Sequence, residues 1–423
     1  MTKDVGVKDI HVGIDLGTSG VRVAAIDTRG RLMRMLGHRW PRGQALSPPT
    51  WEHLTLWLLD HLFRSIGRAD IRTIAVDGTS GTVLLCSPTG RPLSPVLAYN
   101  DNRAIHEAAS AQSALSLAPA AQGPHGGPAK LLWLINHLPP LPAGAQAFPQ
   151  SPWLTGRLLG SMRFCDAHNA LKLGAHNGIW APGLKTLGLA SLLPHIIEPG
   201  HILGPLRTAL VRRFHLRHTP LIVAGTTDSI AGFLALSPLP IGMGVTSLGS
   251  TLALKLASDR PIFVPDLGIY SHRLQTTWLT GGASNSGGAV LTHYFPPDTL
   301  EVLSAQLPLP QSPSLNYYPL LQPGERLPVN DPHYAPRLSP RPPDDRQFLQ
   351  GLLEGLAAIE ARGYQILHDH GAPPLRAVTT VGGGARNKAW RWLREQALGV
   401  PVYNAPHREA AWGVAQLGRR QNF

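Results

Sequence analysis

Residues able to do phosphate chemistry gather close to the amino terminus, where an apolar run ends on the carboxylate Asp15. The turn after it, Leu16-Gly17-Thr18-Ser19-Gly20, leads directly into a second apolar run. Backbone N–H groups in such a glycine turn, together with the hydroxyls of Thr18 and Ser19, can converge on an anion. A carboxylate beside that anion suits a metal ion or an ordered water. The stretch is therefore either an ordinary glycine hairpin or part of a phosphate site.

The same pattern returns much later in the chain. An apolar run that ends at Leu248 is followed by Gly249-Ser250-Thr251 and by another apolar run, Leu252 to Leu256. One such hairpin could be accidental, but a second copy favours a phosphate site and suggests an internal duplication of the fold. We expect two similar domains whose hairpins contact one phosphate chain from opposite sides.

Another carboxylate, Asp228, follows an expected strand and precedes an expected helix. The strand continues into Gly225-Thr226-Thr227, and small apolar residues predict a helix from Ser229 to Leu236. An aspartate in this position can simply cap the helix. It can also act as a general base, because ligands of open α/β sheets bind beyond the carboxyl ends of the strands. The sequence leaves both roles open.

Polar side chains also cluster after two other expected strands. The strand that ends at Val76 is followed by Asp77-Gly78-Thr79-Ser80-Gly81-Thr82 and a further strand, which predicts a second strand–turn–strand unit. A later strand is followed by Tyr99-Asn100-Asp101-Asn102-Arg103. Grouped donors and acceptors of this kind suit a hydroxyl-rich ligand such as a sugar. Alternatively, Asp101 caps a helix over residues 104–111.

Glycines follow a strand expected from Ala377 to Val381. The strand runs into Gly382-Gly383-Gly384-Ala385-Arg386-Asn387, and a helix is expected from Lys388 to Leu398. Glycines at a strand-to-helix junction let a flat ring or a phosphate approach the backbone closely. This junction is a candidate nucleotide contact.

The elements that position these residues alternate between strands and helices, which predicts an α/β fold. The first strands form an antiparallel meander, and the helix after it has Ser47 or Thr50 as its cap. Residues 116–152 and 296–345 are rich in loop-forming residues. Longer helices are expected over residues 50–66, 129–138, 347–370 and 409–420.

Length and composition restrict the class of protein. A chain of 423 residues predicts two or three domains, and 43% hydrophobic with 15% charged residues is typical of a globular protein. The net charge of +12 would suit nucleic acid, but the arginines are scattered and no nucleic-acid-binding module accompanies them. We therefore expect anionic small molecules, and neither a specific nucleic acid nor a membrane, as partners. The oligomeric state stays unknown.

The cysteines and the distribution of apolar residues indicate the cellular compartment. The two cysteines, Cys86 and Cys165, lie far apart and are expected to be buried thiols in a reducing compartment. The first ten residues have no apolar signal-peptide core, and no apolar segment is long enough to cross a bilayer. We expect a cytoplasmic protein.

In their order along the chain, these motifs resemble the FGGY carbohydrate kinase family, within the actin, hexokinase and Hsp70-like ATPase superfamily. The resemblance implies two ribonuclease-H-like domains with ATP and Mg²⁺ in the cleft between them. It implies a domain over residues 1–237 that binds sugar and phosphate, and a nucleotide-binding domain over residues 238–423. The motifs are Gly13-Ile14-Asp15-Leu16-Gly17-Thr18-Ser19, Tyr99-Asn100-Asp101-Asn102-Arg103, Gly225-Thr226-Thr227-Asp228, Leu248-Gly249-Ser250-Thr251, Gly382-Gly383-Gly384-Ala385-Arg386-Asn387 and Glu409-Ala410-Ala411.

The resemblance also implies roles for single residues of the first domain. Asp15 resembles the carboxylate that neighbours the metal and the substrate, and Thr18 resembles a phosphate contact, with Ser19 beside it. Asp228 resembles the general base that takes the proton from the sugar hydroxyl. We expect Asp228 to be the catalytic residue.

In the second domain the resemblance implies nucleotide contacts. Gly249 and Ser250 resemble the second phosphate hairpin, where the family usually has Gly-Thr. Gly383 and Gly384 resemble the nucleotide-binding glycines, and Asn387 resembles the adenine-side asparagine.

The identity of the sugar is indicated by a segment that differs from the patterns of two related groups of kinases. Typical xylulokinases carry a Gly-Gln-Met-His-Gly pattern, and glycerol kinases an Arg-Glu pair, where this chain has Asp77-Gly78-Thr79-Ser80-Gly81-Thr82. This form resembles the D-ribulose kinase branch, which implies D-ribulose as substrate with Ser80 and Asp101 touching it. The alternatives are a xylulokinase or pentitol kinase of the same family, or a weakly hydrolytic ATP-binding protein on the same fold.

Overall fold

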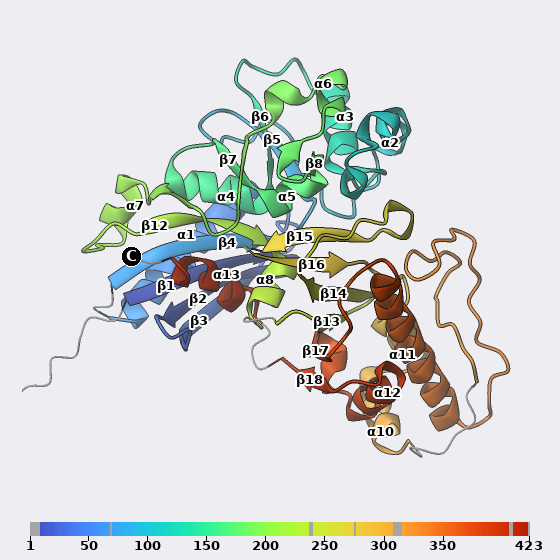
Figure 1. Ribbon diagram of the computed structural model, residues 1–423. Coiled ribbons are helices and arrows are strands. Elements are labelled where there is room, and N and C mark those ends of the chain that lie inside the picture. The colour runs from blue at the N-terminus through green and yellow to red at the C-terminus, as the bar shows by residue number, and fades with distance from the viewer. Residues whose placement is uncertain are drawn as a thin grey trace, which may run out of the picture. The chain divides into compact units, whose positions relative to one another are not determined.

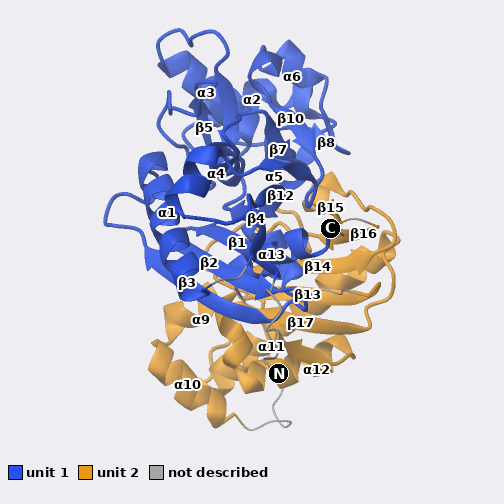
Figure 2. Ribbon diagram, turned by 90° about the vertical axis from the view of Figure 1, so that its left-hand side faces the viewer, with its two compact units in different colours: residues 1–237, 409–423 blue, residues 238–408 orange. Residues whose placement is uncertain are grey.

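The computed structural model describes residues 9–67, 70–236, 240–274, 276–307, 315–405 and 409–421, which form two compact units (Figure 2). Unit 1 comprises residues 1–237 together with 409–423, and unit 2 comprises residues 238–408. The expected division after residue 237 therefore agrees with the structure. The expected second domain, however, is too long by its last segment, because the carboxyl-terminal helix returns to unit 1.

The main sheet of unit 1 has the strand order β11-β12-β4-β1-β2-β3 (Figure 1). Strand β1 pairs antiparallel with β2 and parallel with β4, and β12 pairs parallel with β4. The carboxyl ends of β1, β4 and β12 consequently lie at the same edge of the sheet. The strands are β1 (Asp9–Gly17), β2 (Gly20–Asp27), β3 (Leu32–Arg39), β4 (Asp70–Gly78), β11 (Ile202–Pro205) and β12 (Leu221–Thr227).

Helices cover both faces of this sheet. On one face, α1 (Pro48–Ser65), capped by Ser47, and α4 (Gln150–Leu159) share a core with the alternate β1 residues Val12, Ile14 and Leu16. On the other face lie α8 (Asp228–Leu234) and α13 (Ala410–Arg419). Because side chains alternate along a strand, Asp15 faces α8 and α13 rather than the α1 core.

Two glycines explain why α13 returns to unit 1. A Cβ atom on Gly13 of β1 would lie 1.9 Å from the Ala411 carbonyl oxygen, and one on Gly413 would lie 1.8 Å from the Ala231 carbonyl oxygen. Both contacts require a residue without a side chain. The helix therefore packs backbone-to-backbone on β1 and α8, which places Glu409 at its start.

A long insertion separates β4 from β12. Both strands of the predicted strand–turn–strand unit form, but they do not pair with each other: β5 (Val83–Cys86) leaves β4 and pairs with β6 (Gln146–Pro149) in a separate sheet. The turn passes through Gly81, whose φ of 84° redirects the chain. Leu97 forms only an isolated bridge with Val83, rather than the strand expected there.

The insertion has its own hydrophobic core, distinct from that of the main sheet. Its other elements, with those that lead on to β12, are α2 (Ile105–Ala111), α3 (Gly127–His137), β7 (Phe164–Asp166), α5 (Ala167–Lys172), β8 (Ala175–His176), β9 (Ile179–Trp180), α6 (Gly183–Thr186), β10 (His195–Ile197) and α7 (Thr208–Arg213).

Unit 2 repeats the topology of unit 1. Its sheet has the order β15-β16-β14-β13-β17-β18, in which β13 pairs antiparallel with β14 and parallel with β17. Strands β16-β14-β13-β17-β18 correspond to β3-β2-β1-β4-β12, so the predicted duplication of the fold is confirmed. The strands are β13 (Met243–Leu248), β14 (Leu252–Ser258), β15 (Tyr270–Leu274), β16 (Thr277–Gly281), β17 (Ala377–Val381) and β18 (Val402–Asn404).

The helices of unit 2 are α9 (Gly288–Tyr294), α10 (Pro297–Ala305), α11 (Asp345–Asp369) and α12 (Lys388–Leu398). Helix α10 lies in the region expected to be loop. Its first residue is a proline, which reads as a loop signal in sequence although proline is well tolerated in the first turn of a helix.

Two further expectations can be compared with the structure. Cys86 and Cys165 are both buried free thiols, as expected. Among the described residues, no helix combines the length and the apolar character that crossing a membrane requires.

Candidate active site

Three carboxylates meet at the carboxyl edge of the unit 1 sheet. Asp15 of β1 and Asp77 of β4 are paired in register, and Thr226 of β12 is paired with Asp77. Neighbouring strands lie about 4.8 Å apart, so in-register side chains on the same face are neighbours. Asp228 follows immediately after β12, as the first residue of α8. The sheet thus gathers carboxylates that are widely separated in sequence.

Asp77 is the least expected member of this cluster. Its side chain is fully buried, and neither carboxylate oxygen has a hydrogen-bond partner among the described residues. Burial, reinforced by the charges of Asp15 and Asp228, raises its pKa well above the usual value. Burial among other carboxylates therefore favours the protonated form of Asp77. The sequence placed Asp77 at a strand end but did not identify it as a site residue.

Asp15 shares this environment but has a cationic neighbour. Burial raises its pKa, while the adjacent guanidinium of Arg22 acts in the opposite direction. The Arg22 Nη1 atom donates to Asp15 Oδ2 at 3.3 Å, and Arg22 Nε lies 3.6 Å from Glu409 Oε2. Arg22 was not predicted as a site residue. Its position in the sequence could have identified it, because Arg22 lies two residues after the glycine turn, on the strand expected to pair with the strand that carries Asp15.

Asp228 has the environment expected of a general base. Thr227 occupies the cap position of α8 without a side-chain capping bond, and Asp228 Oδ1 accepts a hydrogen bond from Ser229 N at 2.6 Å. Its side chain is partly accessible, yet burial raises its pKa to about 7, with a contribution from the charge of Asp15. A base that is half ionised near neutral pH is well matched to proton transfer.

The first glycine hairpin forms as predicted, with Thr18 and Ser19 exposed at its tip. Trp40, the residue after β3, fixes the turn. Its Nε1 donates to the Gly17 carbonyl at 2.9 Å, and its backbone N–H donates to the Ser19 carbonyl at 3.1 Å. The turn is therefore held in place from behind, while both hydroxyl-bearing residues remain accessible to a ligand.

Unit 2 brings its predicted residues together at the equivalent edge. Gly249 and Ser250 form the turn between β13 and β14, and Gly383 and Gly384 follow β17. Because β13 and β17 are parallel and Ser247 pairs with Val381, the two glycine-containing segments lie side by side. A Cβ on Gly384 would lie 2.5 Å from the Trp390 ring, so this segment needs glycine for close packing.

Asn387 has a structural role in the described residues. Its Oδ1 accepts from Trp390 N at 2.9 Å, which caps α12, and its Nδ2 donates to Ser304 Oγ at 2.8 Å. Both ends of the amide are thereby engaged within unit 2. A contact with adenine remains a prediction.

The residues expected to touch the sugar lie in the insertion of unit 1. Ser80 is partly exposed, in the turn between β4 and β5. Asp101 does not cap α2, which lacks a side-chain capping bond, so that alternative is wrong. Instead Asp101 Oδ1 accepts from the backbone N–H and the Nε of Arg103, at 3.2 and 2.9 Å. The local Asp-Asn-Arg spacing favours this turn over a helix cap.

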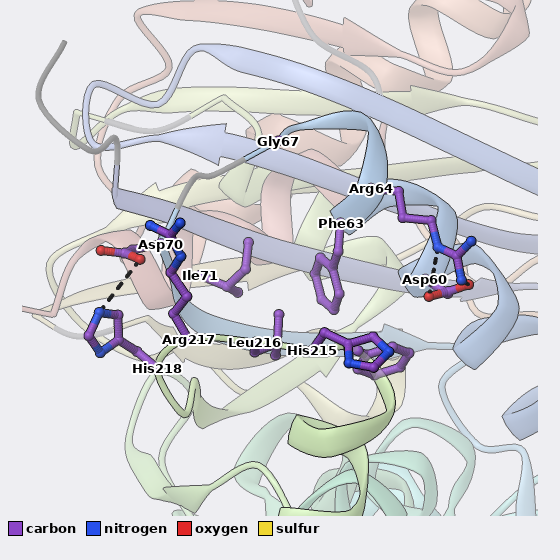
Figure 3. A pocket seen from close by; sticks show the side chains of 11 residues that line it. Asp60, Phe63, Arg64, Gly67, Asp70, Ile71, His215, Leu216, Arg217 and His218 are labelled. Atoms are coloured by element: carbon purple, nitrogen blue, oxygen red, sulfur yellow. Dashed lines mark hydrogen bonds and ion pairs between the residues drawn. The ribbon is translucent and has the colours of Figure 1, made fainter.

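A pocket of about 520 Å³ in unit 1 lies elsewhere (Figure 3). Phe63, Ile71 and Phe214 line it, and its rim carries an ion pair in which His218 Nε2 lies 3.8 Å from Asp70 Oδ1. Asp70 begins β4, whereas Asp77 lies near its end. The pocket is therefore at the opposite edge of the sheet and contains none of the predicted site residues.

The carboxylates suit a magnesium ion that keeps most of its water. Among the described residues, no group of three or more His, Cys, Asp or Glu side chains has the geometry to hold a metal ion. Mg²⁺ usually binds through one or two carboxylates, substrate phosphates and water rather than in an all-protein cage. Asp15, a buried hard oxygen donor beside the first glycine hairpin, fits that requirement.

Residues 245–421 match the C-terminal domain of the FGGY family of carbohydrate kinases. The xylulose kinase of Escherichia coli K12 is 24% identical over 412 residues, which cover 91% of this chain and 84% of that protein. The xylulose kinase of Streptomyces coelicolor is 26% identical over 434 residues, which cover 96% of this chain and 86% of that protein.

Solved structures share the fold over nearly the whole chain. The gluconate kinase of Lactobacillus acidophilus has a TM-score of 0.84 at 19% identity, covering 98% of this chain and 89% of its own. The glycerol kinase of Plasmodium falciparum, solved with ADP, has a TM-score of 0.80 at 14% identity, covering 97% and 89%. Together with the duplicated sheet, these likenesses confirm the predicted fold class of two ribonuclease-H-like domains of the actin and hexokinase type.

Proposed function

We propose that this chain is an ATP-dependent sugar kinase of the FGGY family of carbohydrate kinases, and that its acceptor is a primary hydroxyl of a ketopentose. D-Ribulose, converted to D-ribulose 5-phosphate, is the first candidate. The observation that carries the proposal is the position of Asp228 beside Asp15 and Asp77, with a pKa raised to about 7. This group can accept the proton of a sugar hydroxyl at neutral pH.

The proposed reaction transfers the γ-phosphoryl group of ATP to the sugar oxygen. Such transfer passes through a loose transition state, so positioning and charge neutralisation matter more than a strong base. Asp228 orients the hydroxyl and accepts its proton late in the transfer. The raised pKa of Asp77 favours its protonated form, which places less negative charge beside the anionic phosphoryl group.

Phosphate contacts come from the hairpins. In unit 1, Thr18 and Ser19 offer hydroxyls and backbone N–H groups. In unit 2, Gly249 offers a backbone N–H group, and Ser250 offers a backbone N–H group and a hydroxyl. Bound Mg²⁺ supplies neutralisation of the phosphate charge, and Asp15 is the residue that would neighbour it.

Two further groups of residues complete the assignment. Gly383 and Gly384, with Asn387 nearby, are proposed for the nucleoside end of ATP. Ser80 and Asp101 of the insertion are proposed for the sugar. We also propose a cytoplasmic location, which the two buried free thiols support.

D-Xylulose is the second candidate acceptor. Curated relatives that cover most of the chain are named xylulose kinases, at 24% to 26% identity. The segment Asp77-Gly78-Thr79-Ser80-Gly81-Thr82 favours D-ribulose because it lacks the Gly-Gln-Met-His-Gly pattern of xylulokinases. A pentitol kinase is the remaining sugar-kinase alternative.

A coupled ADP assay distinguishes these functions. The purified protein is supplied with MgATP and, in separate reactions, ribulose, xylulose, ribitol, arabinitol, glycerol or no sugar. We expect the highest kcat/KM with D-ribulose. A higher value with D-xylulose would transfer the assignment to xylulokinase, and equal ADP formation with and without sugar would favour a weakly hydrolytic ATP-binding protein.

A further inference from the structure

We propose that Lys130 is a positioning residue of the sugar site, whose buried ammonium group joins the loop of residues 79–82 to the loop of residues 98–101. These loops carry Ser80 and Asp101. The inference rests on the proposed function insofar as it names the sugar as the ligand of the two loops. The joining of the loops itself rests on geometry alone.

The ammonium group bridges the two backbones directly. Lys130 Nζ donates to the Gly81 carbonyl at 2.9 Å and to the Ala98 carbonyl at 2.6 Å. Gly81 is the residue after Ser80, and the Ala98 carbonyl also accepts the backbone N–H of Asp101 at 3.0 Å. One side chain from α3 therefore fixes the backbone beside both proposed sugar contacts.

A second link joins the same loops. The backbone N–H of Tyr99 donates to Thr82 Oγ1 at 3.1 Å. At the other end of the first loop, Thr79 N donates to Gln150 Oε1 of α4 at 3.0 Å. Ser80 is thus held between an anchor at Thr79, on the main-sheet side, and the Lys130 bridge at Gly81, on the insertion side.

Position 130 is an unfavourable place for a lysine on grounds of burial and helix position. The Lys130 side chain is fully buried, and it lies in the first turn of α3, where the helix dipole disfavours a cation. Burial lowers its pKa to about 8, and the charge of Asp101 acts in the opposite direction. The bonds to two carbonyls on different loops, together with the attraction to Asp101, explain why an ammonium group is retained here.

The arrangement predicts which kinetic constant responds. Loss of the bridge frees Gly81 and Ala98 but leaves the Thr79 anchor and the carboxylates of the main sheet in place. The sugar should therefore bind more weakly, whereas ATP binding should be largely unaffected. If Lys130 were purely structural, its replacement would lower stability and would not change the KM for the sugar more than the KM for ATP.

The test compares Lys130→Met, Lys130→Arg and Thr82→Val with the wild type. For Lys130→Met we expect the KM for the sugar to rise at least about tenfold, a loss of about 1.4 kcal/mol, and the KM for ATP to change less than about twofold. Lys130→Arg keeps donors for the carbonyls and should raise the sugar KM less. Thr82→Val removes the second link without touching a buried charge, so it remains informative if Lys130→Met does not fold.

Lys255→Met is the matched control. Lys255 is also buried, on β14 of unit 2, and its Nζ donates to the Gly281 carbonyl at 3.3 Å. This variant should lower Tm and leave the sugar KM unchanged. If Lys130→Met lowers Tm similarly with an unchanged sugar KM, or if Thr82→Val leaves the sugar KM unchanged, the inference is overturned.

Hydrogen exchange separates this inference from the proposed function. In Lys130→Met, amides of residues 79–82 and 98–101 should exchange faster than in the wild type, while amides of β1 and β2 should not change. Unchanged exchange in both loops would overturn the inference. Failure of the wild type to phosphorylate any sugar would instead overturn the proposed function, because the exchange result does not depend on a sugar.

Discussion

The two units share the order of five strands but differ in the residues at the carboxyl edge of the sheet. In unit 1 the in-register pair at the ends of β1 and β4 is Asp15 and Asp77. In unit 2 the corresponding pair, at the ends of β13 and β17, is Ser247 and Val381. One topology thus presents carboxylates in one copy and uncharged groups in the other. The difference suits proton transfer in unit 1 and the binding of an anionic nucleotide in unit 2.

Buried charges reinforce this difference. In unit 2, Glu360 and Arg394 form a fully buried ion pair, with Nε to Oε2 at 2.5 Å and Nη2 to Oε1 at 2.7 Å. In unit 1, Asp77 is just as deeply buried and has no hydrogen-bond partner among the described residues. Structural charges are usually paired, whereas unpaired buried carboxyls with raised pKa values are typical of functional sites.

The largest expected effect comes from replacing Asp228, the proposed general base of unit 1. Asp228→Asn should lower sugar-dependent kcat/KM by about 10²- to 10⁴-fold, the range for loss of general-base catalysis. The fold should persist, as circular dichroism can verify. Asp27→Asn is a control, because Asp27 lies at the opposite edge of the sheet and is paired with Arg31. Near-wild-type activity of Asp228→Asn would refute the assignment.

The same base sets the expected pH dependence. Because the folded-state pKa of Asp228 is raised to about 7, the ionised, active form increases as pH rises through 7. Wild-type kcat/KM should therefore rise from pH 6 to 8 and level off above that range. A profile that is flat across this range would contradict the role of Asp228.

Breaking the paired charge of unit 2 should affect stability. Glu360→Gln leaves the Arg394 guanidinium buried without its counter-ion, which typically costs about 3 to 5 kcal/mol. Urea unfolding would measure this loss. A change below about 1 kcal/mol would mean that unit 2 does not depend on the pair. Arg260, exposed and paired with its neighbour Asp259, offers a control through Arg260→Gln, for which little change is expected.

Giving unit 2 the carboxylate of unit 1 should weaken nucleotide binding. Ser247→Asp places a negative charge where Asp15 stands in the other copy, one residue before the Leu248-Gly249 turn. We expect the KM for ATP to rise on the order of tenfold, about 1.4 kcal/mol, with the sugar KM little changed. Ser247→Asn controls for size. An unchanged ATP KM would show that the uncharged edge of unit 2 is not required.

The smallest effect should come from replacing Asp77 with a residue that cannot ionise. Its folded-state pKa is raised above the unfolded value, so its ionisation opposes folding increasingly as pH rises above about 4. Asp77→Asn cannot ionise and should have a Tm above that of the wild type at pH 8, with a smaller gap at pH 5. Thermal unfolding at the two pH values tests this. A Tm difference between Asp77→Asn and the wild type that shrinks as pH rises would contradict the prediction.

Local patterns in the sequence determined the hairpins and the strand-end positions of Asp15 and Asp228. An apolar run followed by glycine and small polar residues encodes a strand and turn without reference to distant residues. The repetition of that pattern also predicted the duplicated sheet. Signals of the same kind were less successful where proline was ambiguous, as at Pro297, and where Asp101 resembled a helix cap.

Only the tertiary structure decided which strand ends meet. Pairing of β1 with β4 brings Asp77 against Asp15 and leaves it buried with a raised pKa, and close packing on Gly13 returns α13 to unit 1. The bridge from Lys130 to two separate loops likewise depends on chain segments distant in sequence. The physical reason is common to all three. Parallel strand pairing, burial and charge proximity arise from non-local contacts, whereas sequence periodicity reports only the local backbone.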